Sequence, residues 1–188
     1  MSTPAGVLRF LHVIENLKRT KRTGWVDNKI GDAESISDHM HRMGVLALLI
    51  NDKSLDRTKC IKMAIVHDLA ESIAGDITPH SGVSKEEKFR LEKEGMDEVV
   101  RHLDSSPEAL EIRSLWTEYE EATTEEALYV KDLDKFEMIV QAFEYEKRHN
   151  MKLDTFYAST EGKFRHPTVR KWVEELYRER EQLHADLK

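Results

Sequence analysis

Apolar residues recur at three- and four-residue spacing in segment after segment of this chain of 188 residues. That spacing gathers side chains on one face of an α-helix, whereas a half-buried strand needs apolar and polar residues in strict alternation. We find no alternating run of β-branched residues bounded by turn residues. The pattern therefore predicts an all-α fold, built as one bundle-like domain over residues 1–188.

Capping residues and glycines predict where the helices begin and end. Ser37, Ser84 and Thr123 are each expected to precede or cap a helix, and Pro107 is expected to open another. Gly75 is expected to stop the third helix. The expected helices cover 7–17, 37–51, 56–74, 84–103, 107 onward, 123–149 and 167 onward.

The charge balance is acidic, with 29 Lys and Arg against 36 Asp and Glu and a formal net charge of −7. A chain of this charge offers no broad surface for a polyanion, so nucleic-acid polymers are excluded as expected partners. A small phosphorylated molecule is still compatible with it. Nine histidines in so acidic a chain are unusual and call for a chemical explanation.

The cysteine count and the apolar runs predict the cellular setting. Cys60 is the only cysteine, which excludes an intrachain disulfide and a thiolate cluster and fits a reducing compartment. The longest apolar run, 44–50, is far shorter than the ~20 residues that cross a bilayer. Arg9, His12 and Glu15 interrupt the apolar stretch near the N-terminus, unlike a secretory signal. We expect a cytoplasmic protein without a membrane partner.

The segment from Val66 to Glu71, which reads VHDLAE, carries the strongest chemical signal. An unpaired carboxylate within an apolar helix is costly to bury, so Asp68 requires a partner or a metal ion. On a helix, His67 and Asp68 lie about 100° apart, and both can reach an ion beside the axis. Glu71 lies on the same face, and Asp76 follows just beyond. Imidazole with carboxylate suits Mn, Fe, Co, Ni or Zn, and an oxygen-rich site also accepts Mg.

Two residues outside this segment can complete the set of ligands. His39 lies in the first turn of the expected helix 37–51, and Asp134 lies on a partly apolar stripe, where a carboxylate requires a partner. Each signal also has a plain alternative. A single histidine–aspartate pair occurs by chance, and a lone histidine is more often a packing or surface residue. A charged run such as 85–88 is usually a solvated face.

The order His, His-Asp, Asp on three separate helices resembles the HD superfamily of metal-dependent phosphohydrolases, which are all-helical proteins. The likeness covers the core from about residue 8 to 149 and leaves 150–188 as a C-terminal helical extension of this single HD domain. Within the superfamily the chain resembles the eukaryotic members of the 5′-deoxynucleotidase branch. The segments that carry this resemblance are RTGW at 22–25, ESISDH at 34–39, HDLAE at 67–71, GDI at 75–77 and KDLD at 131–134.

The resemblance implies a metal site and a role for each of its residues. One divalent ion would be held by His39, His67, Asp68 and Asp134. Glu71 and Asp76 would lie on the substrate side, where they direct the attacking water or bind a second ion together with the backbone carbonyl of Ile77. His41 and His80 lie close enough in sequence to support this shell.

Arg22 and Trp25 match the arginine and tryptophan of the family's substrate site. By that resemblance Arg22 would orient the phosphate and neutralise its charge, and Trp25 would pack on the nucleotide, with Asp76 near the sugar hydroxyl. In bacterial relatives the two residues are adjacent, whereas two residues separate them here. Arg19, one helical turn away, therefore stays open as the phosphate ligand.

The activity implied by this resemblance is hydrolysis of deoxyribonucleoside 5′-monophosphates to deoxyribonucleosides and phosphate, with one or two divalent ions such as Mn, Co or Mg. Cyclic nucleotides, nucleoside triphosphates and alarmones stay open as substrates, and so does a noncatalytic metal-binding interaction module. The family also implies a homodimer. The last helix carries an apolar side that suits either the domain core or an interface, formed by Trp172, Val173, Leu176 and Tyr177.

Overall fold

The computed structural model describes residues 1–79 and 81–186, and within them it is helical, without a β-strand. The all-α prediction is confirmed. The only sheet-like pairing in these residues is an isolated bridge between Lys21 and Ser35. The helices are α1 (Pro4–Ile14), α2 (Asn16–Arg19), α3 (Thr23–Asp27), α4 (Ile36–Ala47), α5 (Arg57–Val66), α6 (Glu71–Ala74), α7 (Lys85–His102), α8 (Pro107–Glu121), α9 (Glu125–His149), α10 (Asp154–Thr160) and α11 (Pro167–Asp186).

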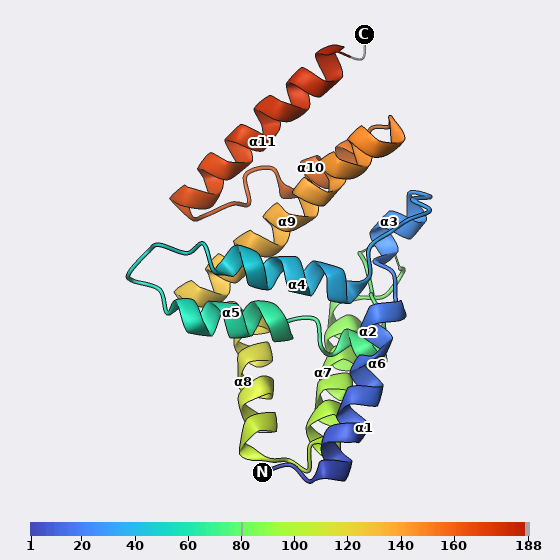
Figure 1. Cartoon of the computed structure of the whole chain (residues 1–188), viewed down its shortest axis with the longest axis vertical. Helices are drawn as coiled ribbons and strands as arrows, with labels where there is room; N and C mark the ends of the chain where they lie inside the picture. The colour runs from blue at the N-terminus through green and yellow to red at the C-terminus, as the bar shows by residue number, and fades with distance from the viewer. Residues whose placement is uncertain (80, 187–188) are drawn as a thin grey trace.

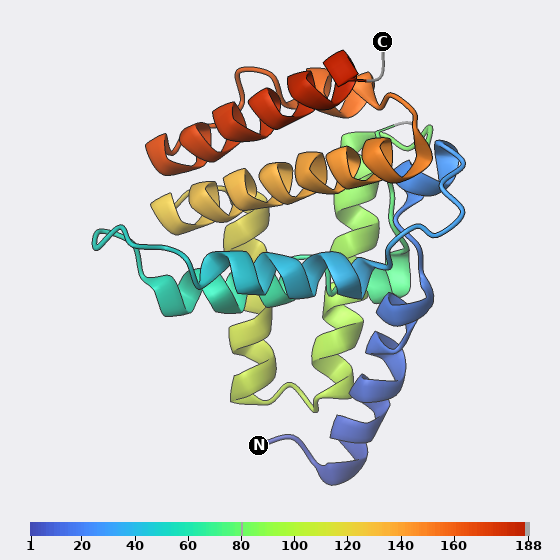
Figure 2. The ribbon, with the colours of Figure 1, turned by 45° about the horizontal axis from the view of Figure 1, so that its top comes forward.

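The helices pack around a central layer formed by α4, α5 and α9 (Figure 1). Helices α4 and α5 lie side by side, and α9 crosses both of them. On one side of this layer α7 and α8 form an antiparallel hairpin that α1 accompanies, and on the other side α11 lies along α9 (Figure 2). The N-terminus lies near the hairpin and the described C-terminal end lies at the opposite end of the molecule.

Most buried apolar side chains form one continuous cluster, and it includes residues on both sides of position 149. Met43, Met63 and Leu133 fill the centre of the layer. Leu153 and Val169, from the segment after α9, join the same cluster. Burial of such side chains is the main term that stabilises a helical bundle, because amphipathic helices gain most of their stability from tertiary packing.

The apolar side of α11 packs into this core. Val173 and Leu176 are buried, and the ring of Trp172 lies against Phe136 of α9 with 5.7 Å between ring centroids. Tyr177 is half-buried beside Tyr157. The sequence left open whether this apolar side of the last helix belongs to the core or to an interface. In the structure it packs into the core.

Two of the expected helix starts are wrong by one or two residues. Ser35, and not Ser37, caps α4, because its hydroxyl accepts from the Asp38 amide while the Asp38 carboxylate accepts from the Ser35 amide. Thr124, and not Thr123, caps α9. The caps before α7 and α8 lie where the sequence places them, at Ser84 and Ser106.

The helix expected over 56–74 is broken in the middle. Helix α5 ends at Val66, and a tight turn over 67–70 leads into the short α6. Within the turn the Leu69 amide bonds to the carbonyl of Val66 and the Glu71 amide to that of Asp68, so three-residue bonding replaces the four-residue pattern. The sequence has no Gly or Pro there to mark the break.

Helix α7 presses directly on this turn through Gly95. A β-carbon built on Gly95 would lie 2.8 Å from the carbonyl oxygen of Ala70. The close approach needs glycine and brings α7 against the backbone that carries His67 and Asp68.

None of the helices within residues 1–79 and 81–186 has the apolar length that a bilayer crossing requires.

We predict that Gly95→Val lowers the free energy of unfolding by about 1–3 kcal/mol, because the new side chain must displace the Ala70 carbonyl. Valine has a better helix propensity than glycine, but this offsets only a few tenths of a kcal/mol of the lost stability. Urea denaturation measures the change. Gly31→Val is the matched control, since a β-carbon there meets no atom of the described chain within 4 Å. Equal stability of the two variants would contradict the prediction.

Candidate active site

The two expected histidine ligands and the two expected aspartates meet where α4, α5 and α9 come together. His39 comes from α4, His67 and Asp68 from the turn directly after α5, and Asp134 from α9. The Nε2 atom of His39 lies 3.2 Å from Asp134 Oδ1 and 3.9 Å from Asp68 Oδ2, and Nε2 of His67 lies 3.2 Å from the same Asp68 oxygen. Both imidazoles are buried, at 0% and 3% exposure.

The hydrogen bonds on the far side of each ring define which nitrogen faces the centre. Nδ1 of His67 lies 2.8 Å from the Ala64 carbonyl oxygen, and Nδ1 of His39 lies 2.5 Å from Glu137 Oε2. Since a carbonyl or carboxylate oxygen accepts, each Nδ1 carries the proton and donates it. Each Nε2 therefore faces the centre, where it would offer its lone pair to a cation, and neither has a hydrogen-bond partner among the described residues.

This arrangement fits a divalent cation. The Nε2 atoms of two imidazoles face carboxylate oxygens at short range, and a positive charge between them makes that approach favourable. The ligand atoms of His39, His67 and Asp134 lie within 4.8 Å of one another. A second group with the same spacing, Glu34, His39 and Glu137, lies behind His39, where its carboxylates are already bonded to Trp25 and Arg42.

The carboxylates at the centre stay ionised although they are partly buried. Burial by itself would raise the pKa of Asp134, but contact with His39 and the neighbouring charges hold it well below the usual value. Burial likewise opposes ionisation of Asp68, and His67 and Arg22 outweigh it, so the pKa of Asp68 is lowered. Tyr119 also donates from its hydroxyl to Asp134 Oδ2 at 2.8 Å.

Arg22 joins the site from the loop before α3. Its Nη1 lies 3.2 Å from Asp68 Oδ2, and its side chain is largely buried. The backbone amide of Arg22 bonds to the Glu34 carbonyl, which fixes the loop. Arg19, the alternative phosphate ligand, is exposed and pairs with Glu15. Of these two arginines, Arg22 is the one at the site.

Trp25 lines the same cavity but is almost fully covered by protein. Its ring stacks on Phe156 of α10 with 4.3 Å between centroids, and its Nε1 donates to Glu34 Oε1 at 2.8 Å. Only 2% of the residue is exposed. The indole is thus held in place before any ligand arrives, and Phe156 presents its own face beside it.

Asp76 ties the turn after α6 to the start of α3. Its Oδ2 accepts from the Thr23 amide at 2.6 Å, and its backbone carbonyl accepts from the Thr23 hydroxyl at 2.8 Å. One carboxylate oxygen of Asp76 is therefore engaged by the loop that carries Arg22. The residue lines the cavity.

Glu71 is buried at the cavity wall with one oxygen available. Its Oε2 has no hydrogen-bond partner within the part of the chain that the structure describes. Burial, with the nearby charges of Asp68 and Asp76, raises the pKa of Glu71 well above its usual value. Such a carboxyl group is suited to exchange a proton with a bound molecule.

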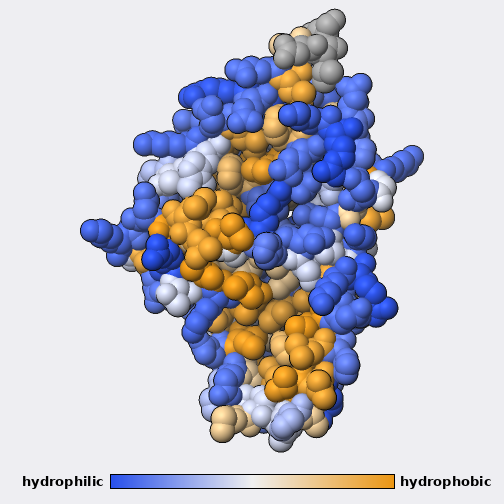
Figure 3. Space-filling model, viewed as in Figure 1, coloured by the Kyte–Doolittle hydropathy of each residue, from blue (hydrophilic) through white to orange (hydrophobic). Residues whose placement is uncertain are grey.

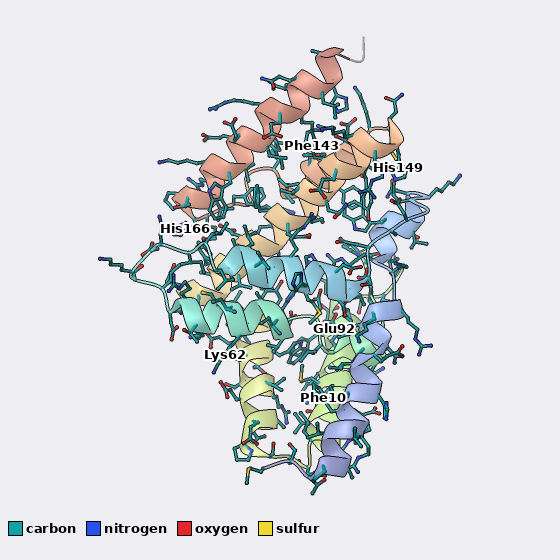
Figure 4. All side chains as sticks on the ribbon, in the orientation of Figure 1. Phe10, Lys62, Glu92, Phe143, His149 and His166 are labelled. Carbon is teal, nitrogen blue, oxygen red and sulfur yellow. The ribbon has the colours of Figure 1, made fainter. Side chains whose placement is uncertain are left out.

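The Ile77 carbonyl, expected at a second ion, instead accepts from the ammonium of Lys88 at 2.8 Å. Lys88 also lies 3.2 Å from Glu92, which is labelled in Figure 4 on α7. The sequence reading of 85–88 as a solvated face is therefore wrong for Lys88, because the start of α7 folds over the loop after α6 and brings this lysine to the cavity.

His67 and Asp68 line one cavity of about 500 Å³ together with Arg22, Glu71, Asp76 and Asp134, large enough for a nucleotide-sized molecule. Aromatic rings such as Trp116 and Phe156 line the same cavity. Residues of α10, beyond position 149, complete the wall.

Other histidines lie away from this cavity. His41 is exposed on α4, and His80 lies outside the described residues. His149 and His166, labelled in Figure 4, pair with Asp32 and Asp52 near the ends of the long helices.

Sequence reasoning missed Tyr119, Glu137, Lys88 and Lys131, whose ammonium lies 3.8 Å from the Tyr119 ring centroid. Lys131 lies in the KDLD segment, which pointed only to Asp134. No local motif separates Tyr119, Glu137 or Lys88 from the many polar positions on the same helices.

Known proteins resemble this chain in both sequence and structure. The sequence profile of the HD domain matches residues 14–175. The 5′-deoxynucleotidase hdd1 of Schizosaccharomyces pombe is 48% identical over 186 residues, covering 97% of this chain and 94% of that protein. The 5′-deoxynucleotidase HDDC2 of Homo sapiens is 47% identical over 178 residues, covering 93% and 86%. The crystal structure of the PH0347 protein from Pyrococcus horikoshii superimposes with a TM-score of 0.75 at 32% identity, covering 94% and 99%. The chain belongs to the HD domain family.

Proposed function

We propose that this protein hydrolyses deoxyribonucleoside 5′-monophosphates to deoxyribonucleosides and inorganic phosphate with the aid of a divalent cation. The observation that carries the proposal is a pair of buried imidazoles beside the cavity. Their Nε2 atoms have no hydrogen-bond partner in the described chain and face Asp68 and Asp134, which line the cavity. The activity named for the fission yeast and human relatives supports the same substrate class.

His39, His67, Asp68 and Asp134 are the proposed metal ligands. A divalent cation bound there supplies Lewis-acid activation of the phosphoryl group. Manganese, cobalt and magnesium are the proposed ions, as the family resemblance implies, and imidazole nitrogen with carboxylate oxygen is compatible with them. A second ion at Glu71, Asp76 and the Ile77 carbonyl would have to displace the Lys88 ammonium from that carbonyl.

Glu71 is the proposed general base. Its available oxygen lies at the cavity wall, and its raised pKa suits a group that takes a proton from an attacking water molecule at neutral pH. Because water is the nucleophile, the reaction needs no serine or cysteine. Cys60 is buried, and we propose no catalytic role for it.

Arg22 and Lys88 are the proposed source of positive charge for the phosphate. A guanidinium neutralises phosphoryl oxygens through paired hydrogen bonds, and Arg22 has further N–H groups besides the one that faces Asp68. Asp76 is proposed to contact the sugar hydroxyl, and Trp25 with Phe156 to border the base. Local cations thereby allow a chain of net charge −7 to bind a dianion.

We also propose a cytoplasmic homodimer. The single cysteine, which is buried and reduced, is compatible with a reducing compartment. Figure 3 shows an apolar patch over α4 and α5, and a second copy of the chain is the proposed occupant of this patch, as family resemblance implies. Its exposed members are Val45, Leu48, Leu49 and Ile65.

Removing the metal should abolish phosphate release, and adding Mn, Co or Mg should restore it. A panel of deoxyribonucleoside and ribonucleoside 5′-monophosphates, cyclic nucleotides, triphosphates and alarmones, assayed by phosphate release, tests the substrate class. We expect the deoxyribonucleoside 5′-monophosphates to be the best substrates. Full activity in the chelated protein would overturn the metal mechanism, and hydrolysis confined to cyclic nucleotides or triphosphates would overturn the substrate class.

Variants of neighbouring residues should separate metal binding from proton transfer. Asp68→Ala should lose the ion, because it removes a ligand. Glu71→Gln should keep the ion and lower kcat by roughly 10²–10⁴-fold, because it removes the base. Metal content by atomic emission and steady-state kinetics measure both effects. Loss of the ion in Glu71→Gln would instead make Glu71 a ligand.

Leu49→Glu should convert the dimer to a monomer, because it places a charge within this apolar patch. Light scattering after gel filtration measures the mass. Leu110→Glu, a change at another exposed leucine on α8, is the control and should leave the mass unchanged. A monomeric wild-type protein would refute the homodimer.

A further inference from the structure

The two candidate histidine ligands are supported in different ways. Nδ1 of His67 donates to the Ala64 carbonyl, three residues back on its own helix. Nδ1 of His39 donates to the carboxylate of Glu137, which comes from α9, 98 residues further along the chain. The ring of His67 is therefore oriented by local backbone, whereas the ring of His39 is oriented by a charged side chain from another helix.

Glu137 is buried with both oxygens engaged. The residue is 2% exposed, and its Oε2 accepts from His39 while its Oε1 accepts from Nε of Arg42 at 2.7 Å. A buried carboxylate without partners would be very costly, so these two contacts account for its presence in the core. Burial opposes ionisation, but the His39 and Arg42 contacts keep the pKa of Glu137 below its usual value.

Arg42 fixes Glu137 from one turn beyond His39 on α4. Its Nη2 donates to Gln141 Oε1 and its Nη1 to Glu144 Oε2, both at 2.8 Å, so a single guanidinium holds three residues of α9. The three lie at positions 137, 141 and 144, which share one face of a helix. Arg42 is only partly buried and reaches the surface at Glu144.

The same two helices thus carry the metal ligands and their support. Helix α4 provides His39 and Arg42 three residues apart, and α9 provides Asp134 and Glu137 three residues apart. A carboxylate that accepts from Nδ1–H makes the opposite nitrogen a stronger donor to a metal and fixes the plane of the ring. Neither Arg42 nor Glu137 lines the cavity, so neither is placed to touch substrate.

We propose that Glu137, held by Arg42, is the positioning residue that orients His39 and sets the affinity of the site for its divalent cation. The inference rests on the metal site of the proposed function and adds to it two residues that act through His39.

A buried glutamate elsewhere on α9 provides a matched control. Glu146 is 0% exposed and receives two hydrogen bonds from Arg180, at 2.8 Å each, and one from the Leu153 amide. It is therefore chemically similar to Glu137, but its partners belong to α10, α11 and the segment before α10. Glu146→Gln removes a buried, arginine-paired carboxylate without touching His39.

The experiment titrates metal-stripped protein with Co²⁺, follows the visible absorption bands of the ion, and obtains the dissociation constant by competition with a chelator. Glu137→Gln should raise the dissociation constant by about 10–100-fold and alter the absorption bands, with the number of ions per chain unchanged. The glutamine has no charge, and its amide N–H groups oppose donors on either His39 or Arg42. Glu146→Gln should lower the melting temperature and keep the wild-type dissociation constant.

Arg42→Lys gives a second test should Glu137→Gln fail to fold. Lysine keeps the positive charge but loses the several N–H donors of the guanidinium. The dissociation constant should therefore rise by less than in Glu137→Gln. A wild-type dissociation constant in either folded variant overturns the proposal. Loss of the ion from Glu137→Gln, as in His39→Ala, overturns it too, since Glu137 would then be a ligand.

Phosphate release is measured separately on the wild-type protein. If that protein binds Co²⁺ and hydrolyses no nucleotide, the proposed function fails while the role of Glu137 stands. If it binds no Co²⁺, the role of Glu137 fails as well.

Discussion

The structure depends on burying ionised groups at the meeting point of its three central helices. His39, His67 and Asp134 occupy positions that leucine or methionine would fill in an ordinary bundle, and the surrounding core is apolar. Desolvation of such groups is unfavourable unless each atom has a partner. Hydrogen bonds satisfy the outward-facing atoms, and the cation proposed above would satisfy the inward-facing ones. Binding of that ion would therefore add to the packing of α4, α5 and α9.

The chemistry of the site was predictable where a motif places groups close together in sequence. His67, Asp68 and Glu71 lie within five residues, and buried carboxylates on helices indicated Asp134. The fold class followed from apolar spacing alone. The break at 67–70 was hidden because no glycine or proline marks it, and it depends on Gly95, which approaches from another helix. Ser35 was overlooked as a cap because its reciprocal partner is Asp38, where the usual pattern has Glu or Gln.

Glu137 and Tyr119 could not be found from sequence for a different reason. Each contacts its partner across a helix packing that only tertiary structure defines, 98 residues from His39 for Glu137 and 15 residues from Asp134 for Tyr119. One more acidic residue on a charged helix such as α9 carries no signal of its own. Contacts that support a ligand from a distant part of the chain therefore require the three-dimensional structure to be found.

The stacking of Trp25 on Phe156 has a consequence for the order in which the protein matures during synthesis. The two rings are 131 residues apart, so the loop that carries Arg22 leaves the ribosome long before the wall that completes its cavity. Until α10 has emerged and docked, the nascent chain holds its ligands in an open cleft that lacks this side. Competence to enclose a small molecule is thus acquired only near the end of translation.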